Sequence, residues 1–487
     1  MKFFEMTFEW PRDPWRGLLV AGALLLATIG GVAHAEEIEK APEDPYDYSH
    51  LENSPSRIED EHTPIQEIPH NTPPPIEFGD PFLSPSEIGQ GWKLPTGAVW
   101  NPSLQLFGTY RTAVQFHDTG AVRNSEWAQR FDVFANLFLT GTERVLIGFR
   151  PLDRDGRFTR YEFTPKATRG WDAVGNDRIE TLFMEGDIGE LFPILDPDDS
   201  GIWDFGFSVG RQPFLIQDGM LIDDTIDAVG LIRNTLRPPG TSNFRVTAVW
   251  GWNEVHRGNN LREHDAQLFG LFTETDFPWS TIAIDAVFVK AQKRSAYIDS
   301  FYGGISATQR IGLLNTTFRV NTSIPTEMET TAISRGTLLF AELAWTFHHS
   351  NNFIYLNGFW GINEYISAAR GPDRGGPLGR VGILFAAVGL GRYGSALSDN
   401  PWRAAGGALG VQIFPGSIRR QIILEVGGRQ ATDGNKRGQM AVGIRLQQAI
   451  WTRFILRGDA FYTWLEQPTP ISPTRNYGGR VELVLKL

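Results

Sequence analysis

The stretch Ser103–His117 (SLQLFGTYRTAVQFH) alternates apolar and polar side chains over its whole length. Successive side chains on a β-strand point to opposite faces, so one face of this stretch is apolar and the other is mostly polar. Phe107 is the one aromatic residue on the polar face. Soluble sheets rarely need so long an alternating strand, whereas a tilted strand that crosses a bilayer needs roughly nine to eleven residues. The stretch therefore predicts a membrane-spanning strand, and the rest of the chain should repeat the pattern until the sheet closes.

The same alternation recurs from about residue 98 to the end of the chain. It is visible in the windows Trp127–Leu139, Trp203–Val209, Val246–Trp252, Thr337–Phe347, Ile422–Val426, Phe454–Trp464 and Tyr477–Leu487. Turn-forming clusters rich in Asp, Gly and Pro separate these windows. Bacterial single-chain barrels have even strand numbers, so the candidates predict an all-β fold, a transmembrane antiparallel β-barrel of 16 or 18 strands over residues 96–487.

The last window should pair antiparallel with the first to close the barrel. It also resembles the C-terminal strand by which the barrel-assembly machinery recognises bacterial outer-membrane proteins, although it ends in Leu487 rather than in Phe. Four longer connectors are expected on the extracellular side, namely residues 153–176, 190–201, 234–243 and 364–379.

The first 35 residues have the features of a cleavable signal peptide. Arg12 and Arg16 precede the apolar run Gly17–Ala33, and Ala33-His34-Ala35 forms a small-x-small cleavage pattern. A retained N-terminal anchor is the alternative. No other segment has about 20 continuous apolar residues, so we expect no further spanning helix.

Residues 36–95 form an acidic, proline-rich segment. They carry fourteen acidic and three basic residues, which accounts for the whole net charge of −11 and leaves the barrel segment neutral. Without a periodic apolar face the segment predicts an extended or disordered linker. The alternative is a plug that folds into the lumen, where carboxylates would meet arginines.

Arginine supplies most of the positive charge of the barrel segment. Nine arginines are predicted on inward faces and are the candidate lining of the solute pathway: Arg111, Arg130, Arg245, Arg319, Arg429, Arg445, Arg453, Arg457 and Arg480. A guanidinium matches carboxylate and phosphate groups, so such a lumen would favour anionic solutes. In the alternative interpretation the arginines pair with inward acids, for which the candidates are Asp132, Glu342, Glu425, Asp459 and Glu482.

A short motif resembles a pattern of alginate-export-type outer-membrane barrels and related porins. Its residues are Gly210, Arg211, Gln212, Asp218, Gly219, Asp224 and Asp227. In that pattern a strand ends in a Gly-Arg-Gln step, and a short acidic loop leads to the next strand. The resemblance implies eighteen strands and passage of an anionic polysaccharide through a basic lumen. The acidic residues could also form a solvated turn or an ion site.

Other functional classes have little support. His348-His349-Ser350-Asn351 contains a His-x-Ser-Asn sequence similar to the motif of outer-membrane phospholipases and lipid A deacylases, but a polar hairpin turn explains it better. Cysteine is absent, the histidines show no metal-ligand spacing, and no phosphate-binding glycine loop occurs, so no cofactor or metal is expected. The net charge argues against nucleic acid as a partner.

These patterns predict an exported outer-membrane porin or export channel, and no enzyme. Its expected partners are outer-membrane lipid, small hydrophilic or anionic solutes that include polymers, and the barrel-assembly machinery. A non-conducting barrel with a structural or adhesive role is the alternative.

Overall fold

The computed structural model describes residues 72–79, 91–198, 200–292, 297–330, 332–435, 437–466 and 475–487. The predicted signal peptide and most of the acidic segment 36–95 lie outside these ranges.

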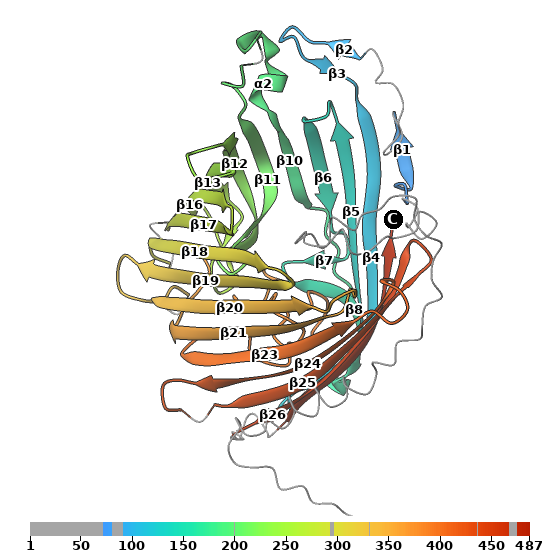
Figure 1. The fold of residues 1–487 in the computed structure, drawn as a ribbon. Coiled ribbons are helices and arrows are strands. Elements are labelled where there is room, and N and C mark those ends of the chain that lie inside the picture. The colour runs from blue at the N-terminus through green and yellow to red at the C-terminus, as the bar shows by residue number, and fades with distance from the viewer. Residues whose placement is uncertain are drawn as a thin grey trace, which may run out of the picture.

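Eighteen antiparallel strands form one closed β-barrel within the described residues (Figure 1). They are β4 (Ser103–Asp118), β5 (Arg123–Phe138), β6 (Arg144–Phe149), β10 (Ile179–Asp187), β11 (Gly206–Ile216), β12 (Ile222–Leu236), β13 (Asn243–Asn253), β16 (Gln267–Phe277), β17 (Ser280–Lys290), β18 (Ser300–Ile311), β19 (Leu314–Pro325), β20 (Gly336–Thr346), β21 (Phe353–Asn363), β23 (Ala404–Ile413), β24 (Arg420–Ala431), β25 (Gln439–Ile450), β26 (Phe454–Leu465) and β27 (Arg475–Lys486). The last strand pairs antiparallel with the first, with Val481 opposite Val114. The predicted barrel, its strand number of 18 and its closing pair are confirmed.

Shorter strands and helices precede the first barrel strand or lie in the connections between barrel strands. The strands are β1 (Ile76–Phe78), β2 (Trp92–Lys93), β3 (Val99–Trp100), β7 (Asp153–Arg154), β8 (Arg157–Thr164), β9 (Gly170–Asp172), β14 (Val255–His256), β15 (Arg262–Glu263) and β22 (Ala369–Arg370). The helices are η3 (Lys166–Thr168), α2 (Ile188–Leu191) and η4 (Pro193–Leu195). None of the helices in the described ranges is long and apolar enough to cross a membrane.

The two faces of the wall follow the alternation seen in the sequence. Outward positions carry large, exposed apolar side chains, which in a soluble protein would be buried in a core. Exposed tryptophans gather near both ends of the barrel: Trp279, Trp345 and Trp451 at one end, and Trp127, Trp171, Trp250, Trp252, Trp360 and Trp464 at the other. Two aromatic girdles around an apolar band are typical of membrane barrels. Inward-facing Phe107, which did not fit the alternation, stacks on Phe134 of the next strand with ring centroids 5.4 Å apart.

The ends of the barrel correct the expected position of two connectors. We call the end where β4 begins and β27 finishes the terminal end, and the opposite end the loop end. Residues 153–176 and 364–379 lie at the loop end, but 190–201 and 234–243 follow β10 and β12 and lie at the terminal end. Antiparallel strands alternate direction, so connectors alternate ends. The prediction that all four share one side was wrong because it ranked connectors by length alone.

Residues 76–78 of the acidic segment lie in the barrel sheet, whereas residues 92–93 pair with β3 in a separate two-stranded sheet. Strand β1 pairs antiparallel with β4, with Ile76 opposite Leu106 and Phe78 opposite Leu104. Strand β27 reaches only to Gly108, where the backbone of Leu487 bonds. Strand β1 therefore continues the edge of β4 beyond the last residue (Figure 1), and residues 72–79 do not plug the barrel.

Candidate functional site

Residues 364–403, which join β21 to β23, cross the lumen and contact wall strands far apart in the sequence. The loop brings Leu384, Phe385 and Leu397, each fully buried, against inward side chains that include Phe359 and Leu338. This apolar cluster lies inside the barrel, where a wide lumen would otherwise hold water. The loop therefore narrows the channel and decides which part of the wall a solute can reach.

Wall arginines hold this loop by its backbone. Arg111 donates a hydrogen bond to the carbonyl oxygen of Val388 (3.2 Å), and Arg130 donates to that of Gly389 (3.1 Å). Arg130 also forms an ion pair with Asp373 of the loop (2.8 Å). Both arginines face the lumen as predicted, but they are occupied by protein groups.

Arg429 has the same role on β24. Its guanidinium donates to the carbonyl oxygens of Ser398 (2.6 Å) and Asn400 (2.7 Å) and lies over the ring of Phe359. No acidic side chain within ion-pair distance is among its described contacts, so the loop carbonyls take the place of a counter-ion.

A wall carboxylate binds the loop from the same side. Glu425 accepts hydrogen bonds from the backbone N–H groups of Ile383 (2.8 Å) and Leu384 (3.2 Å) and from the hydroxyl of Tyr355. Gly382, with a φ of 56°, precedes these donors, and a Cβ there would press on the Glu425 carboxylate. The sequence suggested Glu425 as a partner for arginine; the structure makes it the anchor of the loop.

Four arginines, Arg111 among them, share two carboxylates on neighbouring strands where the barrel closes. The ion pairs are Arg111–Glu482 (2.6 Å), Arg457–Glu482 (3.3 Å), Arg480–Glu482 (3.2 Å), Arg480–Asp459 (2.5 Å) and Arg445–Asp459 (2.5 Å). The side chain of Glu482 is completely buried. Buried charges are stable only when paired, so this network favours the interpretation in which inward acids neutralise the arginines.

The resemblance motif forms an inward-turned hairpin. Gly210 has a φ of 123°, and a Cβ at this position would overlap the carbonyl oxygen of Leu182. Pairing of β11 with β10 ends one residue later, at Arg211. Directly opposite, Asp227 accepts two hydrogen bonds from Arg211 (2.7 and 3.0 Å). The glycine and the ion pair together set the bend at which residues 212–226 leave the wall.

The tip of this hairpin contacts the nearby wall strands β17 and β19 and the loop formed by residues 364–403. Gln217 donates to Asp285 of β17 (2.6 Å), and Asp218 pairs with Arg319 of β19. The carbonyl oxygen of Gly219 accepts from Arg370, in the segment that pairs with β12.

The acidic residues of this hairpin differ in their surroundings: Asp218 at the tip is exposed, as in a solvated turn, whereas Asp223 and Asp224 are buried. Asp224 is buried and accepts from the ring of His256 (2.9 Å), and Asp223 pairs with Arg380 of the long loop (2.6 Å). Gln212 is also buried and donates to the Ala228 carbonyl (3.3 Å). The Gly-Arg-Gln step lies inside β11, whereas the resemblance placed it at the end of the strand.

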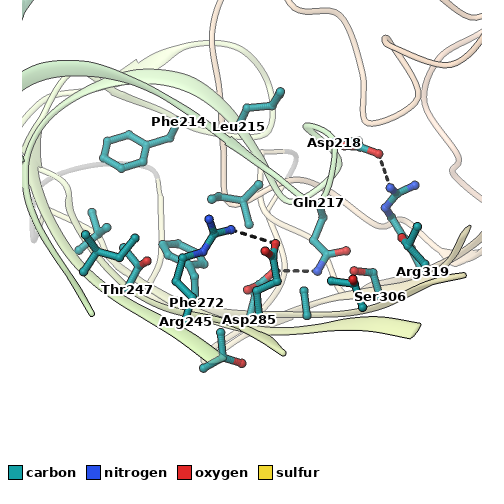
Figure 2. A pocket seen from close by; sticks show the side chains of 18 residues that line it. Phe214, Leu215, Gln217, Asp218, Arg245, Thr247, Phe272, Asp285, Ser306 and Arg319 are labelled. Carbon is teal, nitrogen blue, oxygen red and sulfur yellow. Dashed lines mark hydrogen bonds and ion pairs between the residues drawn. The ribbon is translucent and has the colours of Figure 1, made fainter. Parts of the chain in front are cut away.

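An open part of the lumen, which we call the inner cavity, lies between this hairpin and the wall strands. It has two parts of about 350 and 400 Å³ that share the lining residues Phe214, Ile232, Thr247 and Val249. Figure 2 shows the first part, with Arg245 and Arg319 on its wall. Arg245 pairs with Glu274 directly opposite it (2.9 Å). Of the nine predicted arginines, these two line the first part of the inner cavity.

Two predicted positions lie in turns at the terminal end. Arg453 belongs to the β25–β26 turn and donates to the carbonyl oxygen of Pro73 (2.9 Å), so the prediction of an inward strand position is wrong for this residue. The alternation was extended one residue too far. The sequence 348–351 forms the β20–β21 turn, where Ser350 accepts from the Asn352 backbone (3.0 Å), as a hairpin turn requires.

A smaller polar cavity lies at the loop end, lined by residues that include Arg150, Asp153, Arg178 and His256. Burial raises the pKa of Asp153 to about 6, although Arg130 and Arg150 oppose this shift. No group of three or more His, Asp or Glu side chains suited to a metal ion occurs in the described part of the chain.

No protein-family model and no curated protein sequence matches the chain. Solved structures do match. OccK2 (OpdF) from Pseudomonas aeruginosa aligns with a TM-score of 0.53 at 12% identity, over 79% of this chain and 98% of its own. A BenF-like porin from Pseudomonas fluorescens Pf-5 aligns with a TM-score of 0.54 at 10% identity, over 79% and 98%. The chain has the fold of outer-membrane porins.

A further structure of OccK2, in complex with glucuronate, aligns with a TM-score of 0.51 at 12% identity, over 79% of this chain and 96% of that one. The expected likeness to porins is thus confirmed for the fold, but the specific resemblance to alginate-export barrels is not.

Sequence reasoning missed the lumen-crossing loop. Its only sequence signal was length, because about forty residues separate β21 from β23 and a hairpin needs far fewer.

Proposed function

We propose that this protein is an outer-membrane channel for the passive diffusion of small hydrophilic solutes. The observation that carries the proposal is the inner cavity, which stays open in a closed eighteen-stranded barrel whose remaining lumen is narrowed by residues 364–403 and 212–226. The two aromatic girdles support a position across a lipid bilayer. In this proposal residues 1–35 are cleaved as a signal peptide, and β27 presents the C-terminal strand to the assembly machinery.

Passage of a polymer has less support than passage of small solutes. The loop is fixed to the wall at Arg111, Arg130, Glu425 and Arg429, so a polysaccharide would have to displace it. A general preference for anions also loses support, because most of the predicted arginines are paired with wall carboxylates or loop carbonyls.

Planar-bilayer recording of the refolded mature protein tests the proposal. We expect discrete conductance steps at moderate voltage. Silence at every voltage, from protein that shows the heat-modifiable mobility of a folded barrel, would contradict it.

A non-conducting barrel is the second candidate, and the buried apolar cluster beneath the loop favours it. In that case the loop, and not the acidic segment, closes the barrel. Deletion of 36–79 tests the plug hypothesis for the acidic segment. An increase in conductance would support a plug, and unchanged conductance would contradict it; the pairing of β1 with β4 favours unchanged conductance for residues 72–79.

A further inference from the structure

The inner cavity has more acidic than basic groups on its wall. The charged residues that line its first part are Asp218, Arg245, Glu274, Asp285 and Arg319. The second part, toward the terminal end, adds Glu185 and Asp187 and no basic residue. Five carboxylates and two guanidiniums therefore line the cavity, and Arg144 pairs with Glu185 from beside it. Acidic groups remain in excess, and the potential they create opposes entry of an anion.

Neither guanidinium is left without a counter-ion. Arg245 lies 2.9 Å from Glu274, and Arg319 pairs with Asp218 of the hairpin tip (Figure 2). Asp285 forms no ion pair with an arginine in the described part of the chain and accepts from the amide of Gln217 instead (2.6 Å). A solute carboxylate that enters the cavity must compete with a carboxylate already in place.

The remaining lining is uncharged and of two kinds. Hydroxyl groups line the strand side, from Thr247, Thr281, Ser306 and Thr308. Apolar side chains of the hairpin, Phe214 and Leu215, lie across the cavity from them (Figure 2). A hydroxyl both donates and accepts hydrogen bonds, so a row of hydroxyls exchanges readily with the hydroxyls of a solute. Each part of the inner cavity, at about 350 and 400 Å³, falls in the volume range of small-molecule sites, about 300–1,000 Å³.

We propose that the inner cavity is a subsite for small hydroxylated solutes that lack a carboxylate, and that it discriminates against their carboxylate counterparts. This inference rests on the proposed channel function and names the solute class of the same lumen. Glu274 is its specificity-determining residue, because it neutralises Arg245 where solute must pass.

Three sugars of one ring size test the proposal in liposome swelling with the full mature protein: glucose, glucuronate and glucosamine. We expect glucosamine to enter at least as fast as glucose, and glucuronate several-fold more slowly. Entry of glucuronate as fast as glucose, or faster, would overturn the inference.

The variant Glu274→Gln leaves Arg245 without its counter-ion. We expect the ratio of glucuronate to glucose entry to rise several-fold. The matched control is Glu364→Gln, which removes the acid of the exposed Arg403–Glu364 pair outside the cavity and should leave the ratio unchanged. An unchanged ratio in Glu274→Gln would contradict the role of Glu274.

Failure of this inference is distinguishable from failure of the channel function. A protein that admits no sugar and carries no current contradicts both. A protein that conducts and admits all three sugars equally is a channel without this subsite.

Discussion

The Nε atom of Arg111, on the first barrel strand, lies 2.6 Å from Oε1 of Glu482 on the last. This ion pair spans the junction where the sheet closes. Glu482 also neutralises Arg457 and Arg480, so a single buried carboxylate serves three guanidiniums on three strands.

Replacement of Glu482 should destabilise the closed barrel. Glu482→Gln leaves three arginines short of a counter-ion, and removal of one partner of a buried ion pair costs about 3–5 kcal/mol. Urea unfolding of the refolded protein in liposomes, followed by tryptophan fluorescence, measures the change. Glu185→Gln, in the half-exposed pair with Arg144, should cost no more than about 1 kcal/mol. Equal losses in the two variants would argue against a special role for the closing pair.

Loss of the loop anchor should widen the channel. Glu425→Ala removes the acceptor for the backbone N–H groups of Ile383 and Leu384. We expect larger and noisier single-channel currents, because the loop then samples positions away from β24. Glu466→Ala, a change of the same size at an exposed position in the β26–β27 connector, is the control. Currents that match those of the unaltered protein would show that Glu425 does not hold the constriction.

The bend of the motif hairpin should depend on glycine. Gly210→Ala places a side chain at a φ of 123° and against the Leu182 carbonyl, and such strained positions cost about 1–3 kcal/mol. Loss of unfolding free energy in that range is expected, together with an altered conductance. The control is Gly141→Ala, at which a Cβ meets no neighbouring atom within 4 Å. A Gly210→Ala protein as stable as the control would remove the requirement for glycine.

Ion selectivity should shift toward anions as the pH falls through about 6. Asp153 has a pKa raised to about 6 by burial, so it is charged at pH 7.5 and mostly neutral at pH 5. Its protonation makes the loop-end cavity more positive. Reversal potentials in a salt gradient measure the shift, and Asp153→Asn at pH 7.5 should already lie part of the way to the low-pH value. The shift that the variant still shows on acidification belongs to other groups, such as His256, which lines the same cavity and also gains positive charge.

The same raised pKa has a consequence for stability with the opposite sign to that of most carboxylates. Because the folded state holds the proton of Asp153 more tightly than the unfolded chain does, the contribution is complete below the ordinary pKa of about 3.8 and is lost as the pH rises through about 6. Asp153→Asn should remove this pH dependence.

The sequence alone determined the wall of this barrel. Alternation is a local property with a period of two, so it placed Arg111 and Glu482 on the inner face and paired Ser103–His117 with the last strand. The even strand number follows from the general rule for bacterial single-chain barrels. The acidic character of residues 36–95 follows from their composition.

Only the tertiary structure decided what fills the lumen. Gly210 and Asp227 read as the end of a strand and an acidic turn, but contacts with Leu182 and Arg211 make them the bend of an inward hairpin. Glu425 read as a partner for arginine, and loop amides some forty residues away bind it instead. The groups that an inward side chain contacts depend on loop segments that fold back into the lumen. The local alternation of the strands carries no information about where those segments go.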